Sequence, residues 1–220
     1  MLPTAAPIQE VRNSLTLVRK AHLRPLALTV VLIPLVTLPI ASSGLDATVN
    51  LLAQGMMPLW ATILWSAPPM ILGMIAPFLI PVMASFVPSL RPLAPQLWAS
   101  FLLSLALVSL LKALTGRVHP EAAIPADLFE RSTTLVLFSG NMFEGWPSGH
   151  AATNGAVALT LARLATQPLV QGIGQIWALW VWAAVVLGIN GQVHWLSDML
   201  AGALLALGVT FSLFPKESWP

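Results

Sequence analysis

The residues of this sequence that could do chemistry begin with a short polar stretch, Gly145–His150, which precedes an apolar run ending at Leu164. Pro147 suits the first turn of a helix and Ser148 suits an N-cap, so we expect a helix to begin here. The N–H groups at a helix N-terminus attract anions, and His150 could transfer a proton. The stretch therefore predicts an anion site with proton-transfer chemistry, or else a capped helix with an incidental histidine.

His194 and Asp198 form a second candidate pair, four residues apart in an otherwise apolar segment. This spacing places both side chains on one face of a helix. A carboxylate bonded to one imidazole nitrogen fixes the tautomer and leaves the other nitrogen as a nucleophile or base. With His150 as general acid and Lys112 as anion ligand, the set fits phosphoryl transfer through a phosphohistidine.

Each of these residues also has a plainer interpretation. Lys112 lies at the end of an apolar run and could simply extend its ammonium to the membrane interface. His194 and Asp198 could be a structural pair. A zinc site built from His119, His150 and His194 is the competing chemistry, but it would leave Lys112 aimed at a cation. We therefore expect no metal and no cofactor.

The composition decides the class of protein in which these residues stand. The chain has 220 residues, of which 57% are hydrophobic and 8% are charged, with no cysteine. A soluble domain carries about 25% charged residues, so we predict an integral membrane protein with membrane lipids, and no nucleic acid, as partners. The absence of cysteine excludes a thiolate nucleophile and Cys-ligated zinc.

We predict an all-α membrane bundle of six transmembrane helices, at about 25–41, 58–87, 96–115, 149–164, 172–189 and 194–214. The second run is longer than a hydrocarbon core of about 30 Å requires, and we expect one kinked span there rather than two. Residues 1–24 are expected to form a cytoplasmic or interfacial segment, residues 25–220 the membrane domain, and residues 116–146 a loop on the outer face.

The orientation follows from the basic residues. Six spans put both termini on one side, and that side receives most of the basic residues: Arg12, Arg19, Lys20, Arg24, Arg91, Arg163 and Lys216. The positive-inside rule then predicts cytoplasmic termini. The candidate residues would face the periplasm from a bacterial inner membrane.

The candidate residues resemble the phosphatidic acid phosphatase type 2 superfamily over about residues 96–214. Its three motifs are K-x6-R-P, P-S-G-H and S-R-x5-H-x3-D. Here they correspond to Lys112–Pro120, Pro147–His150 and Leu187–Asp198. The resemblance implies a membrane enzyme that removes or transfers the phosphate of a lipid through a phosphohistidine, without a cofactor. The candidate substrates are a phospholipid, an isoprenoid phosphate or a lipid A phosphate.

The resemblance also implies a role for each matching residue. His194 would be the nucleophile, Asp198 would orient it, and His150 would protonate the leaving oxygen. The residues implied for phosphate binding are Lys112, Ser148 and the Gly149 amide.

The sequence departs from the family pattern at two arginines that would clamp the phosphate bidentately. His119 and Gly188 stand in their places. One explanation is that Arg117 substitutes, with His119 retained as a phosphate ligand and Asn190 and Gln192 as auxiliary donors. A second is a less charged phosphodiester substrate, as for a lipid head-group transferase or a phospholipase C-like enzyme. A third is a non-catalytic lipid-binding relative.

Overall fold

The computed structural model describes residues 6–19, 21–56, 58–117, 119–120, 136–137, 145–188 and 193–214. Its helices are α1 (Ala6–Arg19), α2 (Leu23–Ser42), α3 (Leu45–Met56), α4 (Leu59–Phe86), the 3-10 turn η1 (Arg91–Leu93), α5 (Ala94–Leu114), α7 (Gly149–Leu164), α8 (Pro168–Leu187) and α9 (Leu196–Leu213). Two short strands, β1 (Thr115–Gly116) and β2 (Val136–Leu137), pair antiparallel. The predicted all-α architecture is confirmed.

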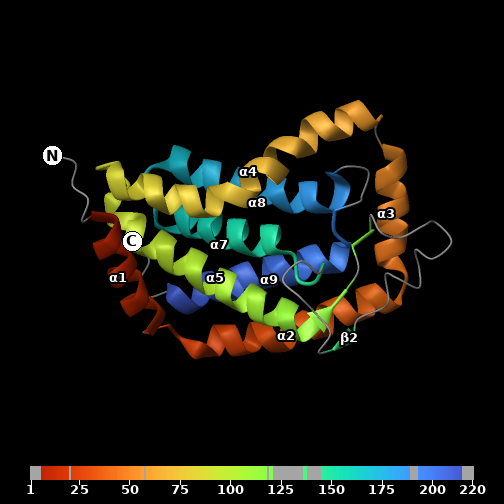
Figure 1. The fold of residues 1–220 in the computed structure, drawn as a ribbon, viewed down its shortest axis with the longest axis horizontal. Helices are drawn as coiled ribbons and strands as arrows, with labels where there is room; N and C mark the ends of the chain where they lie inside the picture. The colour runs from red at the N-terminus through yellow and green to blue at the C-terminus, as the bar shows by residue number, and fades with distance from the viewer. Residues whose placement is uncertain are drawn as a thin grey trace.

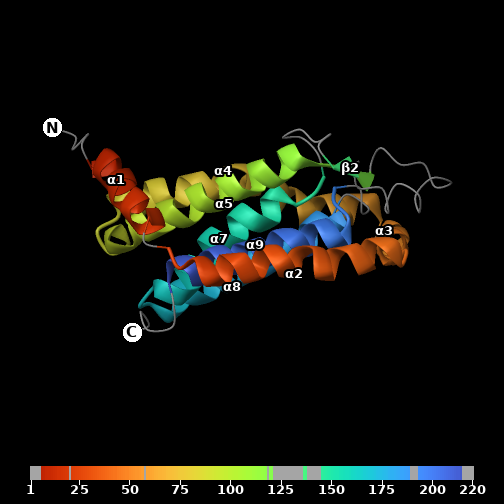
Figure 2. The ribbon, with the colours of Figure 1, turned by 90° about the horizontal axis from the view of Figure 1, so that it is seen from below.

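The long helices run side by side, and α7 lies at their centre (Figures 1 and 2). It packs against α5, α8 and α9, and ten of its 16 residues are buried. Small residues permit this close packing: a Cβ added to Gly155 would lie 2.8 Å from the Cβ of Ala206 on α9. Such small-residue contacts are typical of membrane helices, where close backbone approach supplies the packing energy.

Within the described ranges, five helical segments are long and apolar enough to cross a membrane: α2, α4, η1 with α5, α8 and α9. The predicted run 58–87 is a single helix, α4, of 28 residues. The predicted fourth span is present as α7, but its 16 residues are fewer than a typical membrane-spanning helix of about 20 needs. The count of six spans is therefore not confirmed, whereas the apolar helices agree with a membrane-embedded chain.

Helix α4 contains four prolines, and side chains of neighbouring helices donate hydrogen bonds to the carbonyls that two of these prolines leave without a helical donor. Those prolines are Pro68, Pro69, Pro77 and Pro81. A proline leaves the carbonyl four residues before it without a helical donor. The carbonyl of Gly73, four residues before Pro77, accepts a hydrogen bond from Asn154 Nδ2 at 2.8 Å. The carbonyl of Trp65, four residues before Pro69, likewise accepts a hydrogen bond from Trp180 Nε1 at 3.1 Å. Helix α4 is thus joined to α7 and α8 by hydrogen bonds to the carbonyls that Pro77 and Pro69 leave without a helical donor.

A tight turn redirects the chain between α2 and α3. Gly44 adopts a positive φ of 79°, the left-handed conformation that commonly follows a helix end. Helix α3 then lies across one end of the bundle, opposite the end at which α1 lies (Figure 1). No helix was predicted between the spans at 25–41 and 58–87, so α3 is a feature that the sequence patterns did not reveal.

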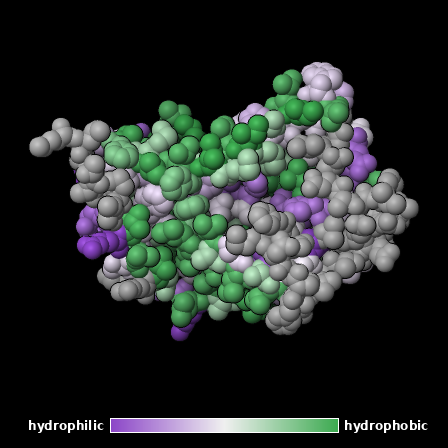
Figure 3. Space-filling view, viewed as in Figure 1, coloured by the Kyte–Doolittle hydropathy of each residue, from purple (hydrophilic) through white to green (hydrophobic). Residues whose placement is uncertain are grey.

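The outer surface of the bundle is hydrophobic. Figure 3 shows hydrophobic side chains over most of the face that carries α4 and α5. Exposed residues of α4 include Leu64 at 69%, Met74 at 67% and Ile71 at 59%. Such an apolar exterior suits contact with lipid acyl chains.

Candidate functional site

One cavity of about 420 Å³ gathers five of the residues predicted from the sequence. It lies among α4, α5, α7 and the residues that precede α9. Its polar lining includes Lys112, His119, Gly149, His150 and His194. Apolar residues of α4 and α5, including Met74, Leu105 and Val108, complete the wall. The cavity therefore joins basic and titratable side chains to an apolar surface.

His194 lies just before α9 and contacts Asp198 in the first turn of that helix, as the spacing predicts. The distance from His194 Nδ1 to Asp198 Oδ2 is 3.4 Å. A carboxylate only accepts, so Nδ1 carries the proton and Nε2 keeps its lone pair. His194 is 5% exposed, and this burial lowers its pKa to about 4. The imidazole is therefore neutral at neutral pH, as a nucleophile requires.

The two other histidines of the cavity are each held by a backbone carbonyl. His119 Nδ1 donates to the carbonyl of Val193 at 2.7 Å, and its ring centroid lies 4.9 Å from that of His194. His150 Nε2 donates to the carbonyl of Met70 at 3.3 Å. Since Nε2 is used in this bond, Nδ1 is the nitrogen through which His150 could exchange a proton with a ligand.

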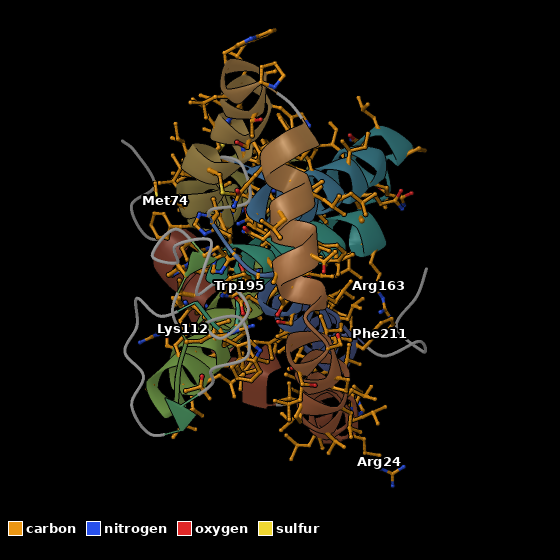
Figure 4. The ribbon with its side chains drawn as sticks, turned by 90° about the vertical axis from the view of Figure 1, so that its right-hand side faces the viewer. Arg24, Met74, Lys112, Arg163, Trp195 and Phe211 are labelled. Carbon is orange, nitrogen blue, oxygen red and sulfur yellow. The ribbon has the colours of Figure 1, made fainter. Side chains whose placement is uncertain are left out.

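Lys112 and Gly149 lie beside each other in the cavity wall. Lys112 is in the last turn of α5 and is 8% exposed. Its Cε lies 3.9 Å from the position that a Cβ on Gly149 would occupy. A glycine here leaves the first turn of α7 open beside the ammonium. Figure 4 looks onto the end covered by α3 and shows Lys112 and Met74 on the same side of the molecule.

Ser148 is placed differently from its predicted role. It is fully buried and is absent from the cavity lining. Its Oγ accepts a hydrogen bond from the Ala151 N–H at 3.3 Å, which confirms the predicted N-cap of α7. Its own N–H donates to the carbonyl of Asp198 at 3.0 Å. In this structure Ser148 joins α7 to α9, and its hydroxyl does not reach the cavity.

Arg117 does not enter the cavity either, contrary to its expected role as a substitute phosphate ligand. Its Nη1 donates to Asp198 Oδ1 at 2.5 Å and its Nη2 to Asp46 Oδ2 at 2.7 Å. The side chain is 2% exposed. Because both terminal nitrogens bind carboxylates of the protein, the guanidinium is not presented to a substrate phosphate.

A family model described as the PAP2 superfamily matches residues 94–218, which is more than half of the chain. The chain belongs to the PAP2 superfamily. No curated protein and no solved structure shows significant similarity to the chain. The superfamily generally comprises phosphatases, which assigns this PAP2 protein to the phosphatase or phosphotransferase class acting on lipid-like substrates.

The structure explains why this PAP2 protein has no arginine at position 188. A Cβ on Gly188 would lie 2.6 Å from the Cβ of Ser66 on α4, which is closer than real Cβ contacts. Any side chain at 188 would therefore displace α4. At the other arginine position, His119 does face the cavity.

The auxiliary donors Asn190 and Gln192 lie outside the described residues. Within the described part of this PAP2 protein, no three His, Cys, Asp or Glu side chains are placed to hold a metal ion together. Two residues near the site were missed by the sequence analysis, Asp46 and Asn154. Asp46 had a signal: it is a lone carboxylate between two apolar runs.

Proposed function

We propose that this PAP2 protein is a membrane lipid phosphatase or phosphotransferase that acts on a lipid-linked phosphate through a phosphohistidine at His194. The observation that carries the proposal is the single cavity in which a neutral His194, His150 and Lys112 meet an apolar wall. The imidazoles supply nucleophilic and proton-transfer groups, and the ammonium supplies a counter-charge for phosphate.

The reaction would proceed in two displacements. His194 Nε2 attacks phosphorus and forms an N–P bond, while the bond from phosphorus to the lipid oxygen breaks. A proton from His150 goes to that oxygen, so the lipid leaves as an alcohol, or as a lipid phosphate when the substrate is a pyrophosphate. Water then attacks phosphorus, His150 takes its proton, and phosphate is released from His194. An acceptor alcohol in place of water would give transfer instead of hydrolysis.

The apolar part of the cavity supports a lipid as the substrate. Met74 and Leu105 line the cavity, and their side chains are 67% and 42% exposed at the hydrophobic exterior. A lipid chain could therefore remain in the membrane while its head group reaches His194. The proposed substrates are a phospholipid, an isoprenoid phosphate or pyrophosphate, or a lipid A phosphate.

We further propose that the cavity faces the periplasm across a bacterial inner membrane. Basic residues support this orientation, since Arg24, Arg91 and Arg163 adjoin helix ends remote from the cavity. A periplasm-specific reporter inserted within residues 121–135 would test it. A reporter that is inactive at this position but active when fused to either terminus would contradict the proposal.

A phosphodiester substrate is the second candidate, and the charge of the cavity favours it. Among the described residues that line the cavity, Lys112 is the one lysine or arginine. A phosphomonoester carries a charge of about −1.5 to −2 at pH 7, whereas a phosphodiester carries a single negative charge. The protein would then be a head-group transferase or a phospholipase C-like enzyme.

The deciding experiment is a product screen with purified protein across lipid phosphomonoesters, pyrophosphates and phosphodiesters, with EDTA as a metal control. We expect turnover that is insensitive to EDTA and is abolished in His194→Ala. His22→Ala is the matched control, because His22 is exposed and joins α1 to α2 away from the cavity. Free phosphate would identify hydrolysis, and an acceptor-dependent phosphodiester product would identify transfer. If no lipid is turned over, or if His194→Ala is as active as wild type, the proposal fails in favour of a non-catalytic lipid-binding protein.

A further inference from the structure

A buried chain of charged side chains extends from His194 away from the cavity, and its far end lies on α3. We propose that Asp46 and Arg117 are positioning residues, which hold Asp198 and thereby the nucleophile His194 in the reactive arrangement. The inference rests on the proposed function of His194, but it concerns two residues that bind no substrate.

At the start of this row of charged side chains, the two carboxylate oxygens of Asp198 contact different partners. Oδ1 accepts the hydrogen bond from Arg117. Oδ2 accepts from the Trp195 N–H at 3.1 Å and faces His194 Nδ1 at 3.4 Å. A carboxylate held at both oxygens cannot rotate about its terminal bond without breaking one of these contacts. Arg117 therefore determines which oxygen His194 meets.

Asp46 binds the other terminal nitrogen of the Arg117 guanidinium and also hydrogen-bonds to Ser197 in α9. Its Oδ2 accepts from Arg117 Nη2 at 2.7 Å, and its Oδ1 accepts from the Ser197 N–H at 2.9 Å. The Ser197 hydroxyl donates to Asp46 Oδ2 and accepts from Arg117 Nη1. Asp46 is 1% exposed and Asp198 is fully buried. Figure 4 labels Trp195, whose ring lies 5.7 Å from the Arg117 guanidinium, beside α3 near the middle of the view.

The charges of this chain suit a phosphorylated histidine. Arg117 alone would neutralise Asp198, whereas Asp46 adds a second carboxylate, so the two carboxylates and one guanidinium sum to −1. When His194 Nε2 binds phosphorus and Nδ1 keeps its proton, the ring becomes positively charged. A buried negative charge behind the ring stabilises that state more strongly than it would in water. Asp46 thus supports the nucleophile by charge as well as by position.

The test is Asp46→Asn in the full-length protein, assayed on the lipid that the wild type turns over best. Outer-shell partners of metal-ligating histidines typically contribute about tenfold to a hundredfold. By analogy we expect kcat of Asp46→Asn to fall by about that factor, with KM within about twofold. Asn50→Ala is the matched control: Asn50 is 4% exposed on the same helix, and its side chain hydrogen-bonds to Gln54. We expect its kcat to match wild type.

A second readout separates positioning from a general structural effect. In wild type the ¹⁵N NMR signals of His194 should report a proton fixed on Nδ1, because Asp198 accepts there. In Asp46→Asn we expect a mixture of Nδ1 and Nε2 tautomers. This measurement needs no substrate. It therefore tests the positioning role of Asp46 and Arg117 even if no lipid is turned over.

The possible results are distinct. A kcat within twofold of wild type together with an unchanged His194 tautomer overturns the inference, while a dead His194→Ala leaves the proposed function standing. If Asp46→Asn does not fold, Ser197→Ala carries the test, since it removes the hydroxyl that bridges Asp46 Oδ2 and Arg117 Nη1 and leaves their direct bond in place. We expect a smaller loss of kcat, about threefold, with the same change of tautomer. A Ser197→Ala protein with wild-type kcat and tautomer would also overturn the inference.

Discussion

Asn154 offers the sharpest test of how the bundle holds His150. The amide lies one helical turn after His150 and is 1% exposed. Its Nδ2 donates to the Gly73 carbonyl at 2.8 Å, and its Oδ1 accepts from Trp177 Nε1 at 3.0 Å. These two bonds join α7 to α4 and α8. Asn154→Leu keeps a similar volume and removes both.

The expected cost follows from the two interhelical bonds lost; a third bond, from Asn154 Nδ2 to the His150 carbonyl at 3.0 Å, lies within α7. Interhelical hydrogen bonds in membrane proteins average about 0.6 kcal/mol and reach about 1.7 kcal/mol, so losing two should lower the free energy of unfolding by about 1–3 kcal/mol. Titration with a denaturing detergent in mixed micelles, followed by tryptophan fluorescence, would measure this change.

A second substitution, Pro77→Ala, tests whether the Gly73 carbonyl relies on Asn154 for its hydrogen bond. The Gly73 carbonyl depends on Asn154 because Pro77 has no N–H to offer it. Pro77→Ala restores that donor, so it should recover about one hydrogen bond, roughly 0.6–1.7 kcal/mol, in the Asn154→Leu background. Pro81→Ala is the matched control, since the carbonyl four residues before it belongs to Pro77. Additive effects of Pro77→Ala and Asn154→Leu, within about 0.3 kcal/mol, would refute the explanation.

Three further outcomes can be measured. Gly188→Arg should lower the midpoint of detergent unfolding and not improve activity, because a Cβ there meets the Ser66 Cβ at 2.6 Å; a more active, equally stable variant would contradict this. His194 should stay neutral as the pH falls from 7 to about 5 and protonate at a pKa of about 4, because burial disfavours the charged ring; a ¹⁵N NMR midpoint near 6.5 would show an exposed ring instead. Ser148→Ala should lower the free energy of unfolding by about 1 kcal/mol through the lost N-cap, with KM near wild type; a large rise in KM at unchanged stability would return Ser148 to the phosphate site.

Local sequence signals predicted the elements well. Hydrophobic runs indicated α2, α4, α5, α8 and α9, and capping residues placed the start of α7 at Gly149. The spacing of His194 and Asp198 predicted their contact, although His194 precedes the first turn of α9 and is not itself helical. Such signals depend on neighbours within a few residues, which the sequence displays directly.

The parts that the sequence analysis missed depend on distant partners. Arg117 was expected at a phosphate because it stands two residues from a motif position, but its carboxylates are 71 and 81 residues away. Nothing local to Arg117 reveals Asp46, which lies on a helix that was not predicted. Ser148 shows the same limit, because only the packing of α9 against α7 decides that its hydroxyl is buried.

The turn at Gly44 has a consequence for how this protein could be recombined with its relatives. The family match begins at residue 94, yet Asp46 reaches Arg117 and Ser197 from outside it. One residue inserted between Gly44 and Asp46 would rotate the rest of α3 by about 100° about its axis and turn Asp46 away from Arg117. A chimera that keeps every motif but exchanges the α2–α3 hairpin would therefore inherit the proposed catalytic histidines without the electrostatic support that we propose for them. The unit of exchange in this enzyme is larger than the segment that defines its family.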